Sequence, residues 1–148
     1  MSVTVLKIIS IKPDFMPTQS VVKQIEVYLN NIFPIEKKVY EFTDDIEFID
    51  PGSNFEKINC NLCGKNIDID TWQEEMDTAF DKDFSEFSFT TSCCQRKNNL
   101  NDLEYLGPAD FAKFVINIAD SKRDISNDEL TAFEQILDVK VRKIWAHY

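Results

Sequence analysis

Alternating apolar positions at the start of the chain predict a strand inside a sheet. In residues 3–11 they occupy both sides of an extended segment: Val3, Val5, Ile9 and Ile11 on one, Leu6 and Ile8 on the other. Apolar side chains on both faces are typical of a strand that is covered on both sides. We therefore place this segment in the centre of a sheet.

Helical spacing follows in residues 18–33. Their apolar side chains recur every three or four positions: Val21, Ile25, Tyr28, Leu29 and Ile32. Pro34 ends the predicted helix. Residues 37–50 then predict a second strand, because apolar and acidic residues alternate up to the turn at 51–54.

The middle of the chain predicts a second helix and a phenylalanine-rich strand. The helix begins near Asp70, with Gln73 as its capping partner, and carries an apolar face: Trp72, Met76, Ala79 and Phe80. Residues 84–92 alternate aromatic and polar side chains, as a half-buried strand does, and lead directly to Cys93.

The last third predicts a fourth strand and a capped helix. Residues 110–120 alternate as a strand, and Ser126 with Glu129 forms a capping box before a helix with one apolar face: Leu130, Phe133 and Leu137. The tail, residues 139–148, fits a short strand or a helix. The spacing of its apolar residues slightly favours a helix: Val141, Ile144, Trp145 and Tyr148.

This order of elements predicts an α+β fold in a single domain, residues 1–148. We expect a four-stranded mixed or antiparallel sheet with helices on one face and a zinc-knuckle insertion. The metal-binding segment would span about residues 55–105. One candidate topology is the split strand-helix-strand layout of ferredoxin-like kind.

Four cysteines are the main candidates for chemistry. Cys60 and Cys63 form C-x-x-C-G, and the adjacent pair Cys93 and Cys94 follows after twenty-nine residues. No signal peptide and no long apolar run is evident, so we expect a cytoplasmic protein, in which thiols stay reduced and bind metal rather than pair as disulfides. Because the sole histidine is His147, the four cysteines are the predicted zinc ligands.

The adjacency of Cys93 and Cys94 complicates this prediction, because neighbouring side chains on a strand point to opposite faces. Both can bind one ion only if the chain turns there. Otherwise one of them binds, and water, an acidic residue or His147 takes the fourth position. A site without metal is a third possibility, and a redox C-x-x-C is disfavoured because no helix begins at Cys60.

Acidic charge is concentrated in the middle of the chain. The net charge is −10, and residues 41–86 alone contain fourteen acidic residues against three lysines, a net charge of −11. Such a field repels nucleic acid and favours a basic protein partner, although acidity also serves solubility alone. The predicted partner-binding residues are four of these acids: Asp44, Asp45, Asp77 and Asp81.

Four segments resemble a set of small, mostly uncharacterised bacterial proteins with a CxxCG…CC pair and an LNDLxY segment. They are "IDPGSNFEKINCNLCGK", "TWQEEMDTAF", "FTTSCCQRKNNLNDLEYLGPADFAKF" and "KIWAHY". The resemblance covers roughly residues 49–148, and Ser92 and Gln95 stand where that pattern has proline and glycine. It implies a paired zinc-knuckle architecture and no particular activity.

Three functions remain open from the sequence. The first is a zinc-stabilised acidic module that binds a basic protein, with a toxin-neutralising immunity protein as its most specific version. The second is a hydrolase that uses an incompletely coordinated zinc and a carboxylate base. The third is a nucleic-acid-binding zinc module, which the charge opposes. We expect a non-enzymatic protein, because no catalytic signature accompanies the cysteines.

Overall fold

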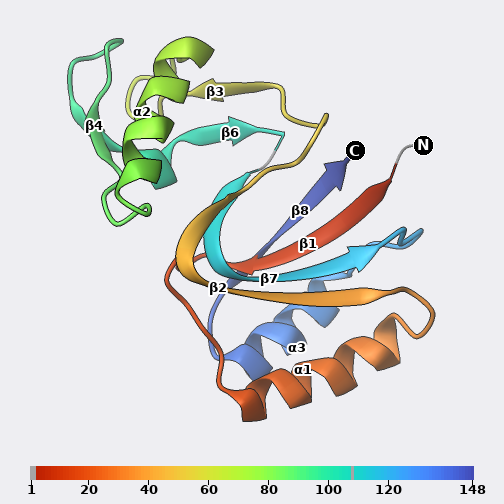
Figure 1. Ribbon diagram of the computed structural model, residues 1–148. Coiled ribbons are helices and arrows are strands. Elements are labelled where there is room, and N and C mark those ends of the chain that lie inside the picture. Colours follow the sequence, from red (N-terminus) through yellow and green to blue (C-terminus); the bar gives the residue numbers. More distant parts are fainter. Residues whose placement is uncertain (1–2, 108) are drawn as a thin grey trace.

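A four-stranded sheet with two helices beneath it forms the larger part of the computed structural model, which describes residues 3–107 and 109–148 (Figure 1). Its elements in chain order are β1 (Thr4–Ser10), α1 (Gln19–Ile32), β2 (Lys38–Ile49), β7 (Asp110–Ala119), α3 (Asn127–Leu137) and β8 (Val141–His147). The strand order is β2-β7-β1-β8, and all neighbours are antiparallel. The predicted α+β class with an antiparallel sheet is confirmed.

The topology is a split strand-helix-strand arrangement. β7 lies between β1 and β2, which α1 connects, so the ferredoxin-like candidate describes the strand order correctly. Both α1 and α3 cover one face of the sheet (Figure 1), where Ile25 and Phe133 join the same hydrophobic core as Leu6 and Ile116. The predicted helices on one face are confirmed.

Side chains cap the start of both helices of this face. Thr18 accepts a hydrogen bond from the Val21 N–H, 3.3 Å away, at the start of α1. Ser126 and Glu129 form the predicted capping box at the start of α3. Such caps satisfy N–H groups that have no partner within the helix.

The C-terminal tail is a strand, so the preference for a helix was wrong. β8 pairs with β1 from Thr4 opposite His147 to Ser10 opposite Val141. Trp145 packs toward the helices, whereas Ile144 packs on the opposite face of the sheet. Because both faces of β8 bury apolar side chains, its residues do not alternate in polarity, and their spacing imitates a helix.

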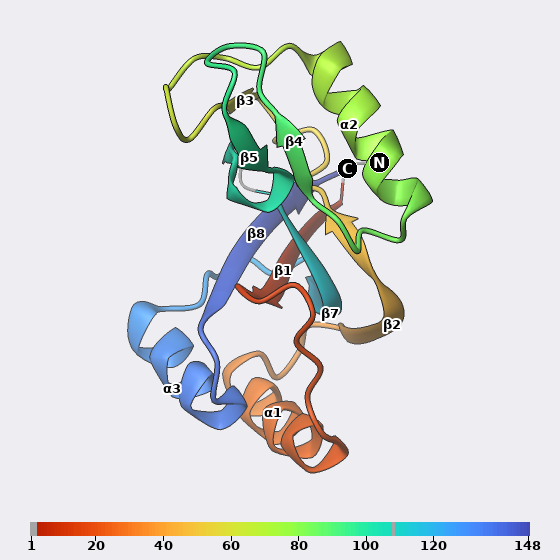
Figure 2. The same cartoon turned by 90° about the vertical axis from the view of Figure 1, so that its left-hand side faces the viewer.

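Between β2 and β7 the chain leaves the sheet and builds a smaller unit, residues 51–107, which we call the cysteine lobe (Figures 1 and 2). It contains β3 (Lys57–Asn59), α2 (Ile69–Asp81), β4 (Ser88–Thr90), β5 (Lys97–Asn99), η1 (Leu100–Asp102) and β6 (Glu104–Leu106). β3 pairs with β6, and β4 pairs with β5, each as a separate two-stranded ribbon.

Two predictions in this lobe need correction. The segment 84–92 is not a strand of the main sheet, because Phe84 and Phe87 pack on Phe111, with ring centroids 5.4 and 4.8 Å away, and only β4 is extended. The N-cap of α2 is Asp68 rather than Asp70, since the Asp68 carboxylate accepts a hydrogen bond from the Thr71 N–H.

The predicted apolar face of α2 is also only partly right. Trp72, Met76 and Ala79 are buried, but Phe80 is 67% exposed. Trp72 donates from Nε1 to the buried hydroxyl of Tyr105, 3.3 Å away. The face of α2 that meets the lobe's core is therefore narrower than the sequence indicated.

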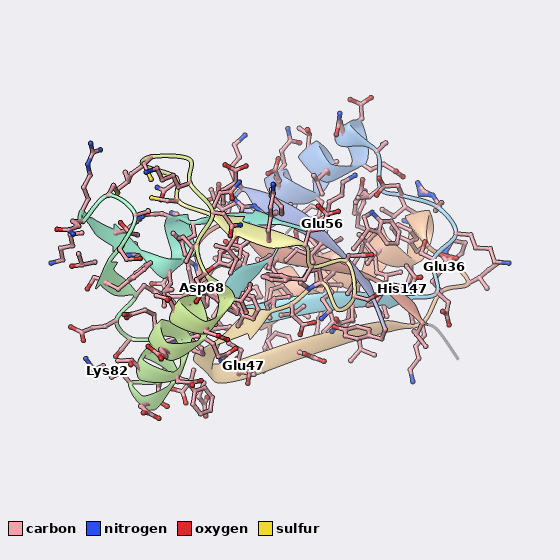
Figure 3. The ribbon with its side chains drawn as sticks, turned by 90° about the horizontal axis from the view of Figure 1, so that it is seen from above. Glu36, Glu47, Glu56, Asp68, Lys82 and His147 are labelled. Carbon is pink, nitrogen blue, oxygen red and sulfur yellow. The ribbon has the colours of Figure 1, made fainter. Side chains whose placement is uncertain are left out.

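The turn at 51–54 joins the cysteine lobe to the edge of β8. The Ser53 N–H donates to the His147 carbonyl at 2.7 Å, and Asn54 donates from Nδ2 to the Trp145 carbonyl at 2.9 Å. His147 is labelled in Figure 3, which looks down on this side of the molecule. Two segments of the resemblance, the one around Gly52 and the C-terminal one, are thus in direct contact.

A buried carboxylate lies where β7 leaves the cysteine lobe. The side chain of Asp110 is only 4% exposed and forms an ion pair with Arg142 of β8. Burial raises the pKa of the Asp110 carboxyl, while Arg142 and the Phe111 N–H oppose that rise. The group is therefore held in its charged form chiefly by its partners.

We expect Arg142→Met to lower the free energy of unfolding by about 2 kcal/mol at pH 7, because the carboxylate loses its partner while buried. A carboxyl whose folded pKa is raised stabilises the fold below its unfolded pKa, and this contribution is lost as pH rises through the folded pKa. The loss should therefore be smaller at pH 4 than at pH 7, because a larger share of the Asp110 carboxyl carries a proton at the lower pH. Urea unfolding at both pH values measures this loss. When Asp110→Asn is already present, the loss caused by Arg142→Met should no longer depend on pH. An equal loss at both pH values would contradict the assignment.

Candidate metal centre

The first cysteine loop is a tight turn, residues 60–65, that follows β3. Cys60 N–H donates to the Lys65 carbonyl, and Gly64 N–H donates to the Cys60 carbonyl, both at 2.8 Å. Gly64 has a φ of +78°, a conformation that glycine adopts at little cost. This backbone turns the side chains of Cys60 and Cys63 toward the same point.

The second cysteine loop, residues 91–96, repeats that backbone. Thr91 N–H donates to the Arg96 carbonyl at 3.0 Å, and Gln95 N–H donates to the Thr91 carbonyl at 2.8 Å. Gln95 has a φ of +52° and stands where the first loop has Gly64. Thr91 therefore occupies the position of the first cysteine, and Cys93 and Cys94 take the third and fourth positions of the turn.

This turn resolves the difficulty of the adjacent cysteines. Cys93 and Cys94 lie on a turn between β4 and β5 rather than on a strand. Neighbouring side chains can converge there, because the two-fold alternation of an extended chain no longer applies.

The four sulfurs meet between the two loops. All four Sγ atoms lie within 4.8 Å of one another, with Cys63 and Cys93 separated by 3.3 Å and Cys60 and Cys94 by 3.9 Å. Four sulfurs bound to a tetrahedral zinc at about 2.3 Å lie about 3.8 Å apart. All four cysteines are free, and their spacing is that of a shell that could hold a metal ion.

Hydrogen bonds to the sulfur of Cys60 favour its thiolate form. Its Sγ accepts from the Leu62 N–H at 3.4 Å and from Nδ2 of the buried Asn98 at 3.6 Å. Burial raises the pKa of the Cys60 thiol, but the N–H groups of Cys63 and Leu62 and the neighbouring thiols outweigh it and lower the pKa to about 6. Burial and the thiols of Cys63 and Cys60 raise the pKa of Cys93. A bound cation would convert all four groups to thiolates.

Asn98 has a role that sequence reasoning missed. Besides its contact with Cys60, its Nδ2 donates to Oδ1 of Asn61 at 2.9 Å, and its Oδ1 accepts from the Asn99 N–H at 2.8 Å. It thereby connects β5 to the first cysteine loop. No spacing rule indicates such a residue, because it acts through a fold-dependent contact.

The two loops differ in how well their sequences suit the turn. We expect Gln95→Gly to raise the free energy of unfolding by about 1 kcal/mol, because a left-handed conformation costs a non-glycine residue roughly that much. Gly64→Ala should lower it by a similar amount, since its Cβ would meet no atom within 4 Å and only the conformational cost applies. Denaturant titration of the two variants tests both signs, and a loss of stability in Gln95→Gly would contradict this account.

The predicted partner-binding acids lie on two neighbouring elements. Asp44 and Asp45 are exposed at an irregularity of β2, and Asp77 and Asp81 are exposed on α2. α2 lies beside the C-terminal part of β2 in Figure 3, where Asp68 and Lys82, the caps of α2, and Glu47 are labelled. Phe48 of β2 contacts Trp72 of α2, with ring centroids 5.6 Å apart, so the two acidic elements belong to adjoining surfaces.

None of the helices in residues 3–107 and 109–148 is long and apolar enough to cross a membrane. Within the same residues, the four cysteines are the one group of potential ligands whose atoms converge, and His147 instead contacts Thr4, with Nδ1 3.2 Å from Oγ1. No protein-family model, no curated protein and no solved structure matches this chain.

Proposed function

We propose that this chain is a zinc-stabilised acidic module that binds a basic protein partner and catalyses no reaction. The observation that carries the proposal is the convergence of four cysteine sulfurs within 4.8 Å. A shell of four thiolates is typical of structural zinc, in which no position is left for substrate. Zinc in such a shell contributes to folding rather than to chemistry.

The donor set favours zinc over harder cations. Thiolates select soft or borderline metals, and four sulfurs in tetrahedral spacing suit zinc or iron. The acidic residues of the lobe are not among the converging ligands. This supports a structural site and argues against the hydrolase alternative, which needs an open position next to a general base.

Charge supports a protein partner of opposite sign. The acids of residues 41–86 include exposed pairs on β2 and on α2, two adjoining elements. A surface of this kind raises the association rate with a cationic protein and repels nucleic acid. The most specific form of the proposal is an immunity protein that covers the basic site of a toxin in the cytoplasm.

The metal is tested by elemental analysis of protein purified without chelator. We expect about one zinc per chain, with X-ray absorption showing sulfur neighbours at about 2.3 Å. One iron per chain would support the structural role of the site but would identify the metal as iron instead of zinc. Protein that holds no metal, and takes up none when zinc is added, would refute the proposed site.

Charge reversal on α2 tests the partner. We expect Asp77→Lys with Asp81→Lys, two exposed positions, to slow association severalfold in low salt and to leave the melting temperature within about 2 °C, because exposed charges contribute little to folding. Stopped-flow or surface plasmon resonance measures the rates against a partner obtained by affinity capture.

The matched control reverses two exposed acids outside the cysteine lobe, Asp14 and Asp128, with the same change in net charge. It should slow association much less. Equal slowing by both variants would show that only net charge matters, and captured partners that are all acidic proteins or nucleic acid would overturn the proposal.

A further inference from the structure

β2 is a long edge strand with one free side. Among the residues that the structure describes, 3–107 and 109–148, it pairs with β7 alone, continuously from Lys38 opposite Ile118 to Phe42 opposite Phe114, before the ladder becomes irregular. In an antiparallel ladder, alternate residues direct their N–H and C=O groups away from the existing partner. Such an edge is a template for another strand.

Apolar surface flanks this edge on both faces of the sheet. On the helix side, Phe42 is 49% exposed and Met16 is 43% exposed, and both line a hollow of about 460 Å³. On the open side, Val39 is 40% exposed and lines a second hollow of about 370 Å³ together with Lys37 and Glu41. The side chains of an added strand alternate between the two faces, so they would enter both hollows.

The charges along β2 are self-complementary. Lys37 and Lys38 stand at its beginning, and Asp44 and Asp45 stand beyond the regular ladder. Two copies of β2 that pair antiparallel about Glu41 bring the lysines of one copy beside the aspartates of the other. The same register sets Tyr40 opposite Phe42 of the second copy, an aromatic pair of the kind that stabilises sheets.

We propose that the free edge of β2 binds a second copy of this chain, forming a two-fold symmetric dimer with a continuous eight-stranded sheet. A two-fold axis suits this surface because each copy contributes the same patch. Glu41 of one copy lies opposite Glu41 of the other on the axis, and this is the one pair of like charges in this register. The inference does not depend on the proposed metal or on a basic partner. It adds that a second copy covers Asp44 and Asp45 and leaves Asp77 and Asp81 accessible.

The decisive experiment uses two complementary single variants of the full chain, Lys37→Asp and Asp45→Lys. Lys37 is chosen because it is exposed, whereas the ammonium of Lys38 donates to the carbonyls of Phe33 and Glu36. Each variant places like charges opposite each other in its own dimer. When the two variants are mixed, the dimer that contains one copy of each pairs an aspartate with a lysine at both ends.

We expect sedimentation equilibrium in about 0.15 M salt to show a wild-type dimer and to show each single variant with a dimer dissociation constant raised at least tenfold. An equimolar mixture of the variants should regain dimers at least as tight as wild type. Glu41→Gln should tighten the wild-type dimer severalfold. Hydrogen exchange of residues 38–42 should slow as protein concentration rises.

Four results would overturn the proposal: wild-type protein that is monomeric at about 1 mM, single variants that dimerise like wild type, a mixture that stays monomeric, or concentration-dependent protection on β8 instead of β2. Melting temperatures within about 2 °C of wild type verify that the variants fold. If one variant fails to fold, the exchange measurement on wild-type protein decides the question alone.

Discussion

Cys60→Ser should abolish binding of the proposed zinc and lower the free energy of unfolding by roughly 3 kcal/mol or more, because the binding energy of a structural zinc, roughly 10–16 kcal/mol in zinc-finger peptides, is folding energy. Cys60 is the fully buried member of the set, and its sulfur accepts hydrogen bonds from Leu62 and Asn98. Serine offers a harder and shorter ligand there. Metal analysis and thermal unfolding, each with and without chelator, measure the two effects.

Leu62→Ser is the matched control, because Leu62 lies in the same loop, is 43% exposed and provides no ligand. It should keep the metal and melt close to the parent. Cys93→Ser and Cys94→Ser should each cause a loss comparable to that of Cys60→Ser if four sulfurs bind. A large effect from only one of the two would select a shell of three cysteines, and a Cys60→Ser variant that melts like the parent with chelator present or absent would refute the structural role.

Gly52→Ala should cost about 3 kcal/mol or more, because it adds a side chain where the backbone is both left-handed and closely packed. Gly52 has a φ of +61°, and a Cβ built there would lie 2.2 Å from the carbonyl oxygen of His147. That carbonyl accepts from Ser53, so the turn cannot move away without losing its contacts with β8.

The control for this variant is Gly64→Ala, which has a left-handed backbone but open space, and should cost only about 1 kcal/mol. Fluorescence of Trp145, isolated by Trp72→Phe, reports on the junction, since Asn54 donates to the Trp145 carbonyl. Gly52→Ala should expose Trp145 at lower denaturant than the parent does. Equal costs for the two alanine variants would show that the close contact with His147 does not matter.

Local sequence determined the elements whose signals are carried within a few residues. The strands at 3–11, 37–50 and 110–120 and the helix α1 follow from the period of their apolar side chains, and the start of α3 follows from Ser126 and Glu129. The candidate ligands could also be named from residue type and number alone, because four cysteines and one histidine leave few combinations. Each of these inferences needs only chain-local geometry.

Tertiary structure decided what depends on partners distant in the chain. β8 is a strand because it forms an antiparallel ladder with β1. Both of its faces bury apolar residues, so its sequence lacks the alternation of apolar and polar residues that predicts a strand. Phe84 and Phe87 do not belong to the main sheet, because they pack on Phe111 in the core of the cysteine lobe. Cys93 and Cys94 converge on Cys60 and Cys63 because a second loop repeats the turn of the first with Gln95 in place of glycine. Packing and long-range hydrogen bonds outweigh local preference at these places, since the free energy gained there exceeds the small propensity differences that a sequence pattern records.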